Sequence, residues 1–165
     1  EHYNIDFWEM KEAAKHQYCN ILEPGNVGGH CIPVYPWFLI NELNVPLIKA
    51  ARDLNDDMIN YYAKKIEKIK GKKVGVIGLS YREGVKEKAY SRSIDLIRLL
   101  KKKGYDVYGL DHLYSKEETE KEFDVKYLDD LNKMDVIVLM NKESDLKNKL
   151  LKFKNKVVDV KNVLN

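Results

Sequence analysis

A cysteine preceded by two glycines is the residue of this sequence best suited to covalent chemistry. Cys31 follows Gly28, Gly29 and His30 and lies two positions before Pro33. Glycines let a backbone approach a ligand closely, and a thiol beside a basic group in a loop can become a nucleophilic thiolate. The spacing alone leaves a second interpretation open, in which Cys31 is an unreactive small side chain and His30 only hydrogen-bonds to nearby backbone.

The other cysteine, Cys19, is expected to pack against apolar neighbours such as Tyr18, Ile21 and Leu22. No C-x-x-C pair or zinc-type His/Cys spacing is present, so we expect no metal site and no disulfide framework. No apolar run approaches the roughly 20 residues that span a bilayer, and the start does not read as a signal peptide. The sequence therefore predicts a cytoplasmic protein, without a membrane partner, whose thiols stay reduced.

Charge is nearly balanced along the chain. The 29 basic and 26 acidic side chains leave a formal net charge of +3. Lysine and glutamate alternate, which is typical of solvated helix faces with ion pairs. Since no groove-sized basic patch is evident, we expect no nucleic-acid partner.

The first 70 residues carry helical periodicity on both sides of a loop rich in glycine and proline. Apolar side chains recur at helical spacing over residues 7–16. A longer amphipathic pattern begins at Pro46, which suits the first position of a helix, and Gly71 fits its end. So long a helix is not expected to bury its whole apolar stripe within one small subunit. Residues 46–70 therefore predict a homodimer.

Residues 71–165 change to an alternation of strands and helices. We expect strands at residues 73–79, 106–110, 135–140 and 156–160. We expect helices around residues 94–100, closed by Gly104, and at 115–123, where Ser115 and Glu118 form a capping box. Strands that are apolar on both faces and separated by helices predict a parallel, doubly wound sheet. The sequence therefore predicts an α/β fold. A helical dimerisation segment (1–70) is followed by a Rossmann-like domain with a doubly wound parallel sheet (71–165).

The first strand begins like a dinucleotide-binding unit, but its glycine pattern is incomplete. Gly75 lies inside the expected strand and Gly78 at its end, whereas G-x-G-x-x-G needs its first two glycines two positions apart. Asp111, after the second strand, occupies the position of a ribose-binding acid. A phosphate-bearing ligand at the carboxyl ends of the strands is expected. The alternative is a sheet that uses glycine only for tight packing.

Stretches spread over nearly the whole chain resemble the UDP-glucose/GDP-mannose dehydrogenase family. Residues 20–39, Asn-Ile-Leu-Glu-Pro-Gly-Asn-Val-Gly-Gly-His-Cys-Ile-Pro-Val-Tyr-Pro-Trp-Phe-Leu, resemble its active-site loop. Further similar stretches are 5–9 (Ile-Asp-Phe-Trp-Glu), 51–56 (Ala-Arg-Asp-Leu-Asn-Asp), 76–82 (Val-Ile-Gly-Leu-Ser-Tyr-Arg) and 158–162 (Val-Asp-Val-Lys-Asn). The His-Cys-Ile-Pro version is similar to the branch that acts on UDP-N-acetylmannosamine.

This resemblance implies a nucleotide-sugar 6-dehydrogenase that oxidises the sugar alcohol of a UDP-sugar substrate to a uronic acid. In that mechanism the thiol of Cys31 attacks the aldehyde formed by a first hydride transfer. A second hydride leaves the thiohemiacetal to give a thioester, and water releases the acid. Two NAD molecules carry the hydrides.

The resemblance also implies roles for individual residues. Cys31 is the expected catalytic residue within the segment 1–70. The residues expected to bind substrate are Gly28, Gly29, His30, Tyr81 and Arg82, and those expected to bind cofactor are Lys161 and Asn162. Arg82 stands where the family has a lysine, so the charge is kept but its geometry differs.

Some positions depart from the family pattern. Tyr35 stands where the family has an aspartate that orients water or transfers a proton, and residues 86–91 lack the arginine of an Asp-Asp-x-Arg-Glu-Ser element. The family's NAD-binding domain would lie before Glu1. We therefore expect a piece of a longer protein or the product of a split gene, inactive as a dehydrogenase by itself.

Two other functions remain open at this point. One is a non-catalytic module that binds UDP-sugar or dimerises, derived from a split or truncated gene. The other is a thiol-dependent redox or acyl-transfer protein that uses Cys31 without NAD. The second is disfavoured because no resolving cysteine lies near Cys31.

Overall fold

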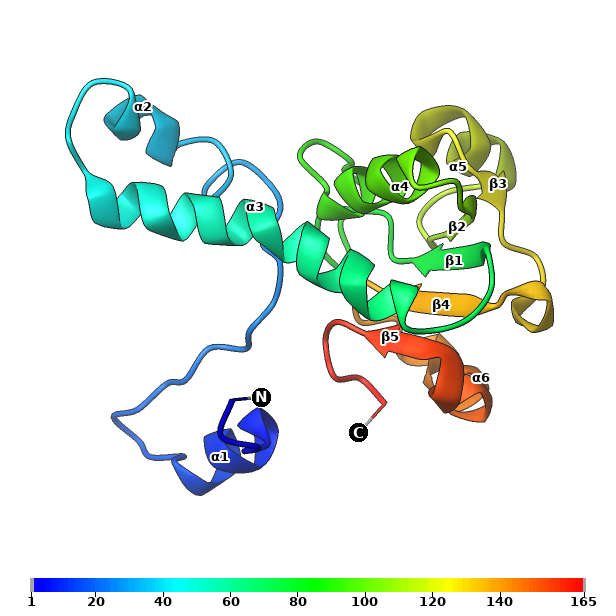
Figure 1. Ribbon diagram of the computed structural model, residues 1–165, viewed down its shortest axis with the longest axis horizontal. Helices are drawn as coiled ribbons and strands as arrows, with labels where there is room; N and C mark the ends of the chain where they lie inside the picture. Colours follow the sequence, from blue (N-terminus) through cyan, green and yellow to red (C-terminus); the bar gives the residue numbers. More distant parts are fainter. Residues whose placement is uncertain (1, 165) are drawn as a thin grey trace.

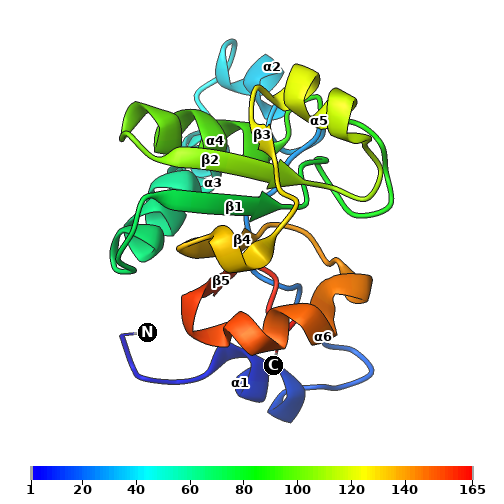
Figure 2. The same cartoon turned by 90° about the vertical axis from the view of Figure 1, so that its right-hand side faces the viewer.

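The computed structural model describes residues 2–164 and, of Ser144, only the backbone. Five strands form one sheet in the order β3-β2-β1-β4-β5, and all neighbouring pairs are parallel. The strands are β1 Lys73–Ile77, β2 Asp106–Leu110, β3 Lys126–Tyr127, β4 Val136–Leu139 and β5 Val157–Asp159. From β1 the chain winds outward to β2 and β3, then returns to the other side of β1 for β4 and β5 (Figure 2). The winding direction therefore reverses between β1 and β4, where doubly wound sheets bind ligands.

Helices cover both faces of the sheet, as the sequence predicted (Figure 1). On one face, α3 (Pro46–Glu67), α4 (Arg92–Lys102) and α5 (Lys116–Phe123) pack over Val74 and Val76 of β1. The other face carries Ile77 and is covered by α6 (Lys147–Leu150) and the short 3-10 helices η1 (Leu131–Lys133), η2 (Ser144–Leu146) and η3 (Leu151–Lys156). Successive strand residues point to opposite faces, so the central strands β1 and β4 are buried at nearly every position.

The predicted helix caps of the sheet domain are present. Ser115 Oγ accepts from Glu118 N at 3.2 Å, and Glu118 Oε2 accepts from Ser115 N at 2.8 Å, which confirms the capping box. Ser91 caps α4 by accepting from Ser93 N at 3.3 Å. Gly104 follows α4 with a left-handed φ of 76° and closes it as expected. These caps fix where each helix meets the loops at the end of the sheet.

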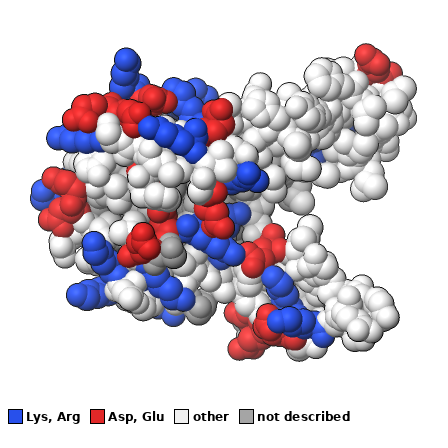
Figure 3. All heavy atoms as spheres, turned by 180° about the vertical axis from the view of Figure 1, so that it is seen from behind, with Lys and Arg blue, Asp and Glu red and all other residues white. Residues whose placement is uncertain are grey.

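The long helix α3 has two different halves. Its carboxy-terminal half is buried against the sheet domain through Ile59, Tyr62 and Ile66, and burial raises the pKa of Tyr62 to about 12. Its amino-terminal half extends away as an arm, on which Leu47 is 82% and Leu54 67% exposed. The short helix α2 (Pro36–Ile40) lies beside this arm. Figure 3 shows the arm largely without charged side chains on the face seen.

Several local expectations were wrong or incomplete. Helix α1 (Phe7–Ala13) stops before residue 16 and lies apart from the sheet (Figure 1). Helix α3 ends at Glu67, so Gly71 is not its C′ residue; a Cβ on Gly71 would stand 2.2 Å from the Asp135 side chain, and the glycine serves the tight entry into β1. Helix α2 and strand β3 were missed because neither is long enough to show a periodicity. Within residues 2–164, no helix is both long and apolar enough to cross a membrane.

Candidate functional site

A cavity of about 400 Å³ lies at the carboxyl ends of β1, β4 and β5. The segment after β1 contributes Tyr81, Arg82 and Glu83, the segment after β4 contributes Asn141 and Lys142, and the segment after β5 contributes Lys161. The loop before α2 contributes Glu23, Asn26, Val27 and Gly28. The cavity thus occupies the ligand position of a doubly wound sheet, with the glycine loop as one wall.

Two cations of this cavity have no ion-pair partner among the described residues. Lys161 is half-buried, and burial lowers the pKa of its ammonium. Arg82 is exposed, with its guanidinium carbon 5.6 Å from the centroid of the Tyr81 ring. By contrast, Lys142 pairs with Glu23 at 3.1 Å, and this hydrogen bond holds the pKa of Glu23 below its usual range. Unpaired cations at this position suit an anionic group such as a diphosphate.

The wall formed by the glycine loop is fixed by a polar network that the sequence analysis missed. The side chain of Asn55, on α3, accepts from Val27 N and donates to Val27 O, both at 2.9 Å. Asn26 is buried; it donates to Asn55 O at 3.1 Å and accepts from Arg92 Nε at 2.7 Å. These bonds attach the loop to α3 and α4 together. Asn55 belongs to the stretch 51–56 that resembles the dehydrogenase family, and that resemblance was the available signal.

Gly28 and Gly29 allow the loop to lie against two tyrosines of the β1–α4 connection. A Cβ on Gly28 would stand 2.9 Å from Tyr90 O, and one on Gly29 would stand 2.9 Å from the Tyr81 ring. Gly29 also has a φ of 80°, a backbone angle that residues other than glycine rarely adopt. The expected close approach therefore exists, but at Gly29 the protein's own Tyr81 occupies the space.

Cys31 lies beyond these glycines at the start of a helical turn. The carbonyl of His30 accepts from Val34 N at 3.0 Å and from Tyr35 N at 3.1 Å. The thiol is exposed, as a nucleophile requires. The Tyr35 ring, where an aspartate was the family pattern, is stacked with Phe38 at a centroid distance of 6.2 Å.

The expectation that Cys19 is buried was wrong. Cys19 is exposed, and its neighbours Tyr18 and Leu22 are 86% and 77% exposed. Apolar neighbours in the sequence did not pack, because the segment between α1 and α2 runs outside the core.

The predicted site residues fall into three places. Gly28, Tyr81, Arg82 and Lys161 line the same cavity. Gly29, His30 and Cys31 are not among its lining residues and follow Gly28 directly along the loop. Asn162 lines a different cavity, of about 450 Å³, beside Phe7, Trp8 and Tyr61. The structure therefore brings the two expected cofactor residues, Lys161 and Asn162, to different cavities.

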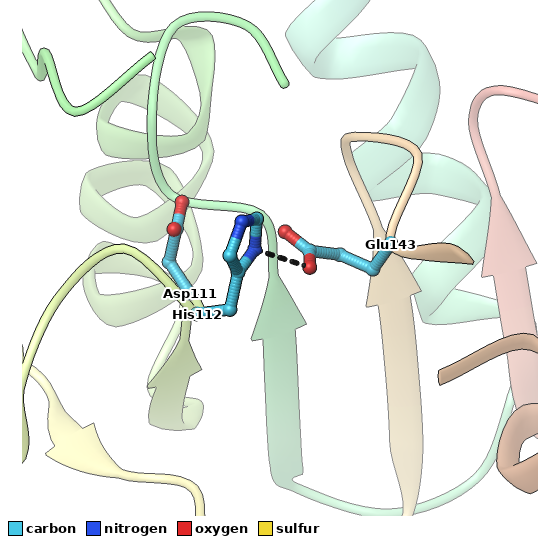
Figure 4. A group of neighbouring side chains, drawn as sticks. All are labelled: Asp111, His112 and Glu143. Carbon is cyan, nitrogen blue, oxygen red and sulfur yellow. Dashed lines mark hydrogen bonds and ion pairs between the residues drawn. The ribbon is translucent and has the colours of Figure 1, made fainter. Parts of the chain in front are cut away.

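Asp111, His112 and Glu143 gather at the ends of β2 and β4, with possible ligand atoms within 4.8 Å of one another (Figure 4). Asp111 already accepts from Leu79 N, Ser80 N and Ser80 Oγ through Oδ2 and from Leu113 N through Oδ1. Burial raises the pKa of Glu143, which hydrogen-bonds His112 Nδ1 at 2.7 Å. The hydrogen bond between His112 and Glu143 ties the β2 and β4 loops together. Asp111 thus holds the β1 turn, and its carboxylate is not free for a ribose.

Arg52 is buried with only one end of its guanidinium paired. Nη2 bonds both oxygens of Asp56 at 2.8 Å, while Nε and Nη1 have no partner among the described residues. The side chain lines a further cavity of about 400 Å³ beside Pro33 and Tyr90. Buried N–H groups without an acceptor are costly, so Nε and Nη1 of Arg52 are suited to an additional hydrogen-bond acceptor.

Comparison with known proteins agrees with this geometry. The sequence model of the UDP-glucose/GDP-mannose dehydrogenase family, UDP binding domain, matches residues 75–165. The chain belongs to the UDP-glucose/GDP-mannose dehydrogenase family. The matched region contains β2 to β5, the last three residues of β1 and most of the cavity wall, so the family resemblance extends from the glycine loop into the sheet domain.

Individual members of the family match the chain from end to end. A UDP-N-acetyl-D-mannosamine dehydrogenase of Methanocaldococcus jannaschii is 40% identical over 100% of this chain and 42% of its own length. The solved UDP-N-acetyl-mannosamine dehydrogenase of Staphylococcus aureus is 27% identical, with a TM-score of 0.75 over 99% of this chain and 42% of that one. The fold is also that of the UDP-D-ManNAc dehydrogenase from Pyrococcus horikoshii, at a TM-score of 0.78, 23% identity and the same coverages. This family member spans about 42% of the length of these relatives and corresponds to their carboxy-terminal, UDP-binding part.

The described residues of this family member do not fit a dinucleotide. Gly75 is inside β1, where a Cβ would meet Leu128 at 2.9 Å, so it serves core packing. The connection from Gly78 to Ser91 is too long to be the tight turn that brings a helix amino terminus onto a pyrophosphate. A complete NAD site is therefore not formed by residues 2–164.

Proposed function

We propose that this chain is the UDP-binding part of an NAD-dependent nucleotide-sugar 6-dehydrogenase, which converts UDP-N-acetyl-D-mannosamine to the corresponding uronate. The observation that carries the proposal is the cavity at the sheet's carboxyl edge. It brings two cations that form no ion pair within residues 2–164 next to the glycine loop that leads to Cys31. The named activity of the relatives supports the choice of sugar. A cytoplasmic location accords with two free, exposed cysteines.

In this proposal the diphosphate lies between Lys161 and Arg82, neither of which forms an ion pair with a described residue. Charge-assisted hydrogen bonds to a phosphate are stronger than neutral ones. Tyr81 offers an aromatic face on the same wall, and Gly28 brings backbone close to the ligand. The sugar then extends along the loop toward Gly29, His30 and Cys31. Lys161 is assigned here to nucleotide binding, and cofactor contacts by Asn162 remain a prediction.

The chemistry proposed for Cys31 is covalent. Oxidation of the C6 alcohol removes one hydride and one proton and gives an aldehyde. The thiolate adds to that carbon, loss of a second hydride forms a thioester, and water cleaves the C–S bond to give the carboxylate and the free thiol. Both hydrides need an acceptor, and NAD is the proposed one. Because the described residues do not form its site, we expect no turnover by this chain alone.

A homodimer through α3 is part of the proposal. The arm exposes an apolar stripe that includes Leu47 and Leu54 beside exposed residues of α2 such as Phe38. Contiguous exposed apolar surface of this kind marks an interaction site. A second copy is the simplest partner, because an isologous interface needs only one surface.

Mass spectrometry of the intact enzyme that contains this chain tests the catalytic proposal. With UDP-N-acetyl-D-mannosamine and NAD, uronate should form, and a quenched reaction should contain a thioester on Cys31. Cys31→Ser should abolish the acid and the adduct, while Cys19→Ser, the matched control, should leave both intact. Acid production by Cys31→Ser at the normal rate would refute the thioester route. UDP-sugar binding without any oxidation would favour the non-catalytic module.

A further inference from the structure

The connection between β1 and α4 touches the nucleotide cavity at one end and the cysteine loop at the other. Tyr81 lines the cavity, and its ring lies against Gly29. Nine positions later, Tyr90 O accepts from Gly29 N at 3.2 Å. The Tyr90 ring meets the His30 ring edge to face, with centroids 4.9 Å apart and planes at 75°. The segment before Cys31 is thus held by two tyrosines of one loop.

Tyr90 is not placed there by ordinary core packing. Its side chain is 53% exposed, so burial of the ring contributes little. Its backbone adopts a φ of 55°, which is uncommon for a residue other than glycine and costs free energy. The next residue anchors this conformation, because Ser91 Oγ donates to Leu79 O at 2.6 Å while it caps α4. Strained backbone held by its surroundings is typical of functional sites.

The backbone of His30 fixes where the turn that carries the thiol begins. Cys31 is the next residue, and the His30 carbonyl is the acceptor for the turn that contains Cys31. The thiol itself is exposed, and no hydrogen bond of its own Sγ to a described residue fixes it. Its position therefore depends on the contacts of Gly29 and His30.

We propose that Tyr90 is a positioning residue for Cys31, which holds the Gly29–His30 backbone against the loop that also lines the nucleotide cavity. A nucleotide that contacts Tyr81 would then share one rigid support with the thiol. The inference rests on the proposed function only in treating Cys31 as the nucleophile. The edge-to-face packing of Tyr90 on His30 and the hydrogen bond from Gly29 N to Tyr90 O do not depend on that function.

Amide exchange in the purified 165-residue chain tests the contact. Tyr90→Phe keeps the ring, whereas Tyr90→Asn removes it and retains a residue that tolerates positive φ. Exchange of the Gly29 amide should be roughly 2- to 10-fold faster in Tyr90→Asn, from the size of an edge-to-face contact, and unchanged in Tyr90→Phe. The ring-current shift of the His30 protons should vanish only in Tyr90→Asn. Equal exchange in all three proteins would overturn the proposal.

Kinetics of the intact enzyme separate positioning from a merely structural role. Tyr90→Asn should lower kcat by about 10- to 100-fold, the range expected for a small misplacement of a reacting group, with KM for the UDP-sugar unchanged and the thermal midpoint only slightly lowered. Tyr90→Phe should restore kcat. A rise in KM alone, or an unchanged kcat, would contradict the positioning role. Failure of UDP to bind would sink the proposed function and leave the amide-exchange result standing, so the two are distinguishable.

Discussion

The ammonium of Lys161 lies directly beneath the backbone of Gly25. A Cβ built on Gly25 would stand 3.1 Å from Lys161 Nζ. The glycine loop therefore covers the half-buried cation, which explains why burial lowers the pKa of Lys161. The backbone of Lys161 is itself fixed, because its N–H donates to Asp159 Oδ1 at 3.1 Å. The Lys161 side chain thus lines the cavity from the segment after β5, and the loop that leads to Cys31 covers its ammonium.

Gly25→Ala should weaken nucleotide binding more than it weakens the fold. Gly25 has no left-handed φ and its neighbour is the flexible end of a lysine. The free energy of unfolding should therefore change by no more than about 0.5 kcal/mol, as at ordinary surface positions. Displacement of the ammonium should lower UDP affinity a few-fold. Thermal unfolding and calorimetric titration of the same sample check both, and an unaffected UDP affinity would contradict the proposed role of Lys161.

The affinity for UDP should fall at high pH because of Lys161. Burial lowers the pKa of this lysine, so it loses its proton below the value of about 10.4 for a free lysine. A diphosphate favours the charged form, so binding is strongest below the pKa of Lys161 and weakens as pH rises through it. Lys161→Arg stays charged and should show a flatter profile. Dissociation constants from about pH 7 upward test this, and parallel profiles would refute it.

Gly29→Ala should destabilise the protein more than Gly84→Ala. Both glycines have left-handed φ values, 80° and 71°. A Cβ on Gly84 meets nothing within 4 Å, whereas one on Gly29 meets the Tyr81 ring at 2.9 Å. The backbone cost of about 1–2 kcal/mol is shared, and Gly29→Ala should add a steric cost of about 1–3 kcal/mol. Denaturant unfolding measures both free energies. Equal values would mean that the loop is not held against Tyr81.

Charge on the arm should dissociate the proposed dimer. Leu54, 67% exposed on α3, is expected to lie in the interface, so Leu54→Glu would place a carboxylate in an apolar contact. Leu151, 42% exposed beside β5 and away from the arm, offers the matched variant Leu151→Glu. Sedimentation should give a dimer for the wild type and for Leu151→Glu, and a monomer for Leu54→Glu. A dimeric Leu54→Glu would place the interface elsewhere.

Periodicity was sufficient for the centre of the sheet because β1 and β4 are buried on both faces. Residues 74–77 and 136–139 contain no polar side chain, since alternate residues pack into opposite cores. Strand β3 escaped because Lys126 and Tyr127 form an edge strand with no apolar run. The predictions for Gly71 and Cys19 were wrong for one reason. The local sequence does not show which other segment of the chain, if any, packs against a given residue.

The site was only partly readable for the same reason. The glycine loop, Arg82 and Lys161 could all be found from a family resemblance, although Lys161 was expected to bind cofactor. That Lys161 shares a cavity with Arg82, and Asn162 does not, depends on the direction in which the chain leaves β5. The role of Asn55 in holding the glycine loop could not be predicted from the sequence, because it depends on two hydrogen bonds to Val27, which is distant along the chain.

The most direct test of the account is calorimetric titration of the purified chain with UDP, alongside Lys161→Ala. Lys133→Ala is the matched control, since Lys133 is an exposed lysine that pairs with Asp129 and does not line the cavity. The wild type and the control should bind UDP saturably. Lys161→Ala should lower the affinity about 10-fold or more, as for loss of a hydrogen bond to a charged group. No binding of UDP, or equal affinities in all three proteins, would contradict the assignment of this cavity as the nucleotide site.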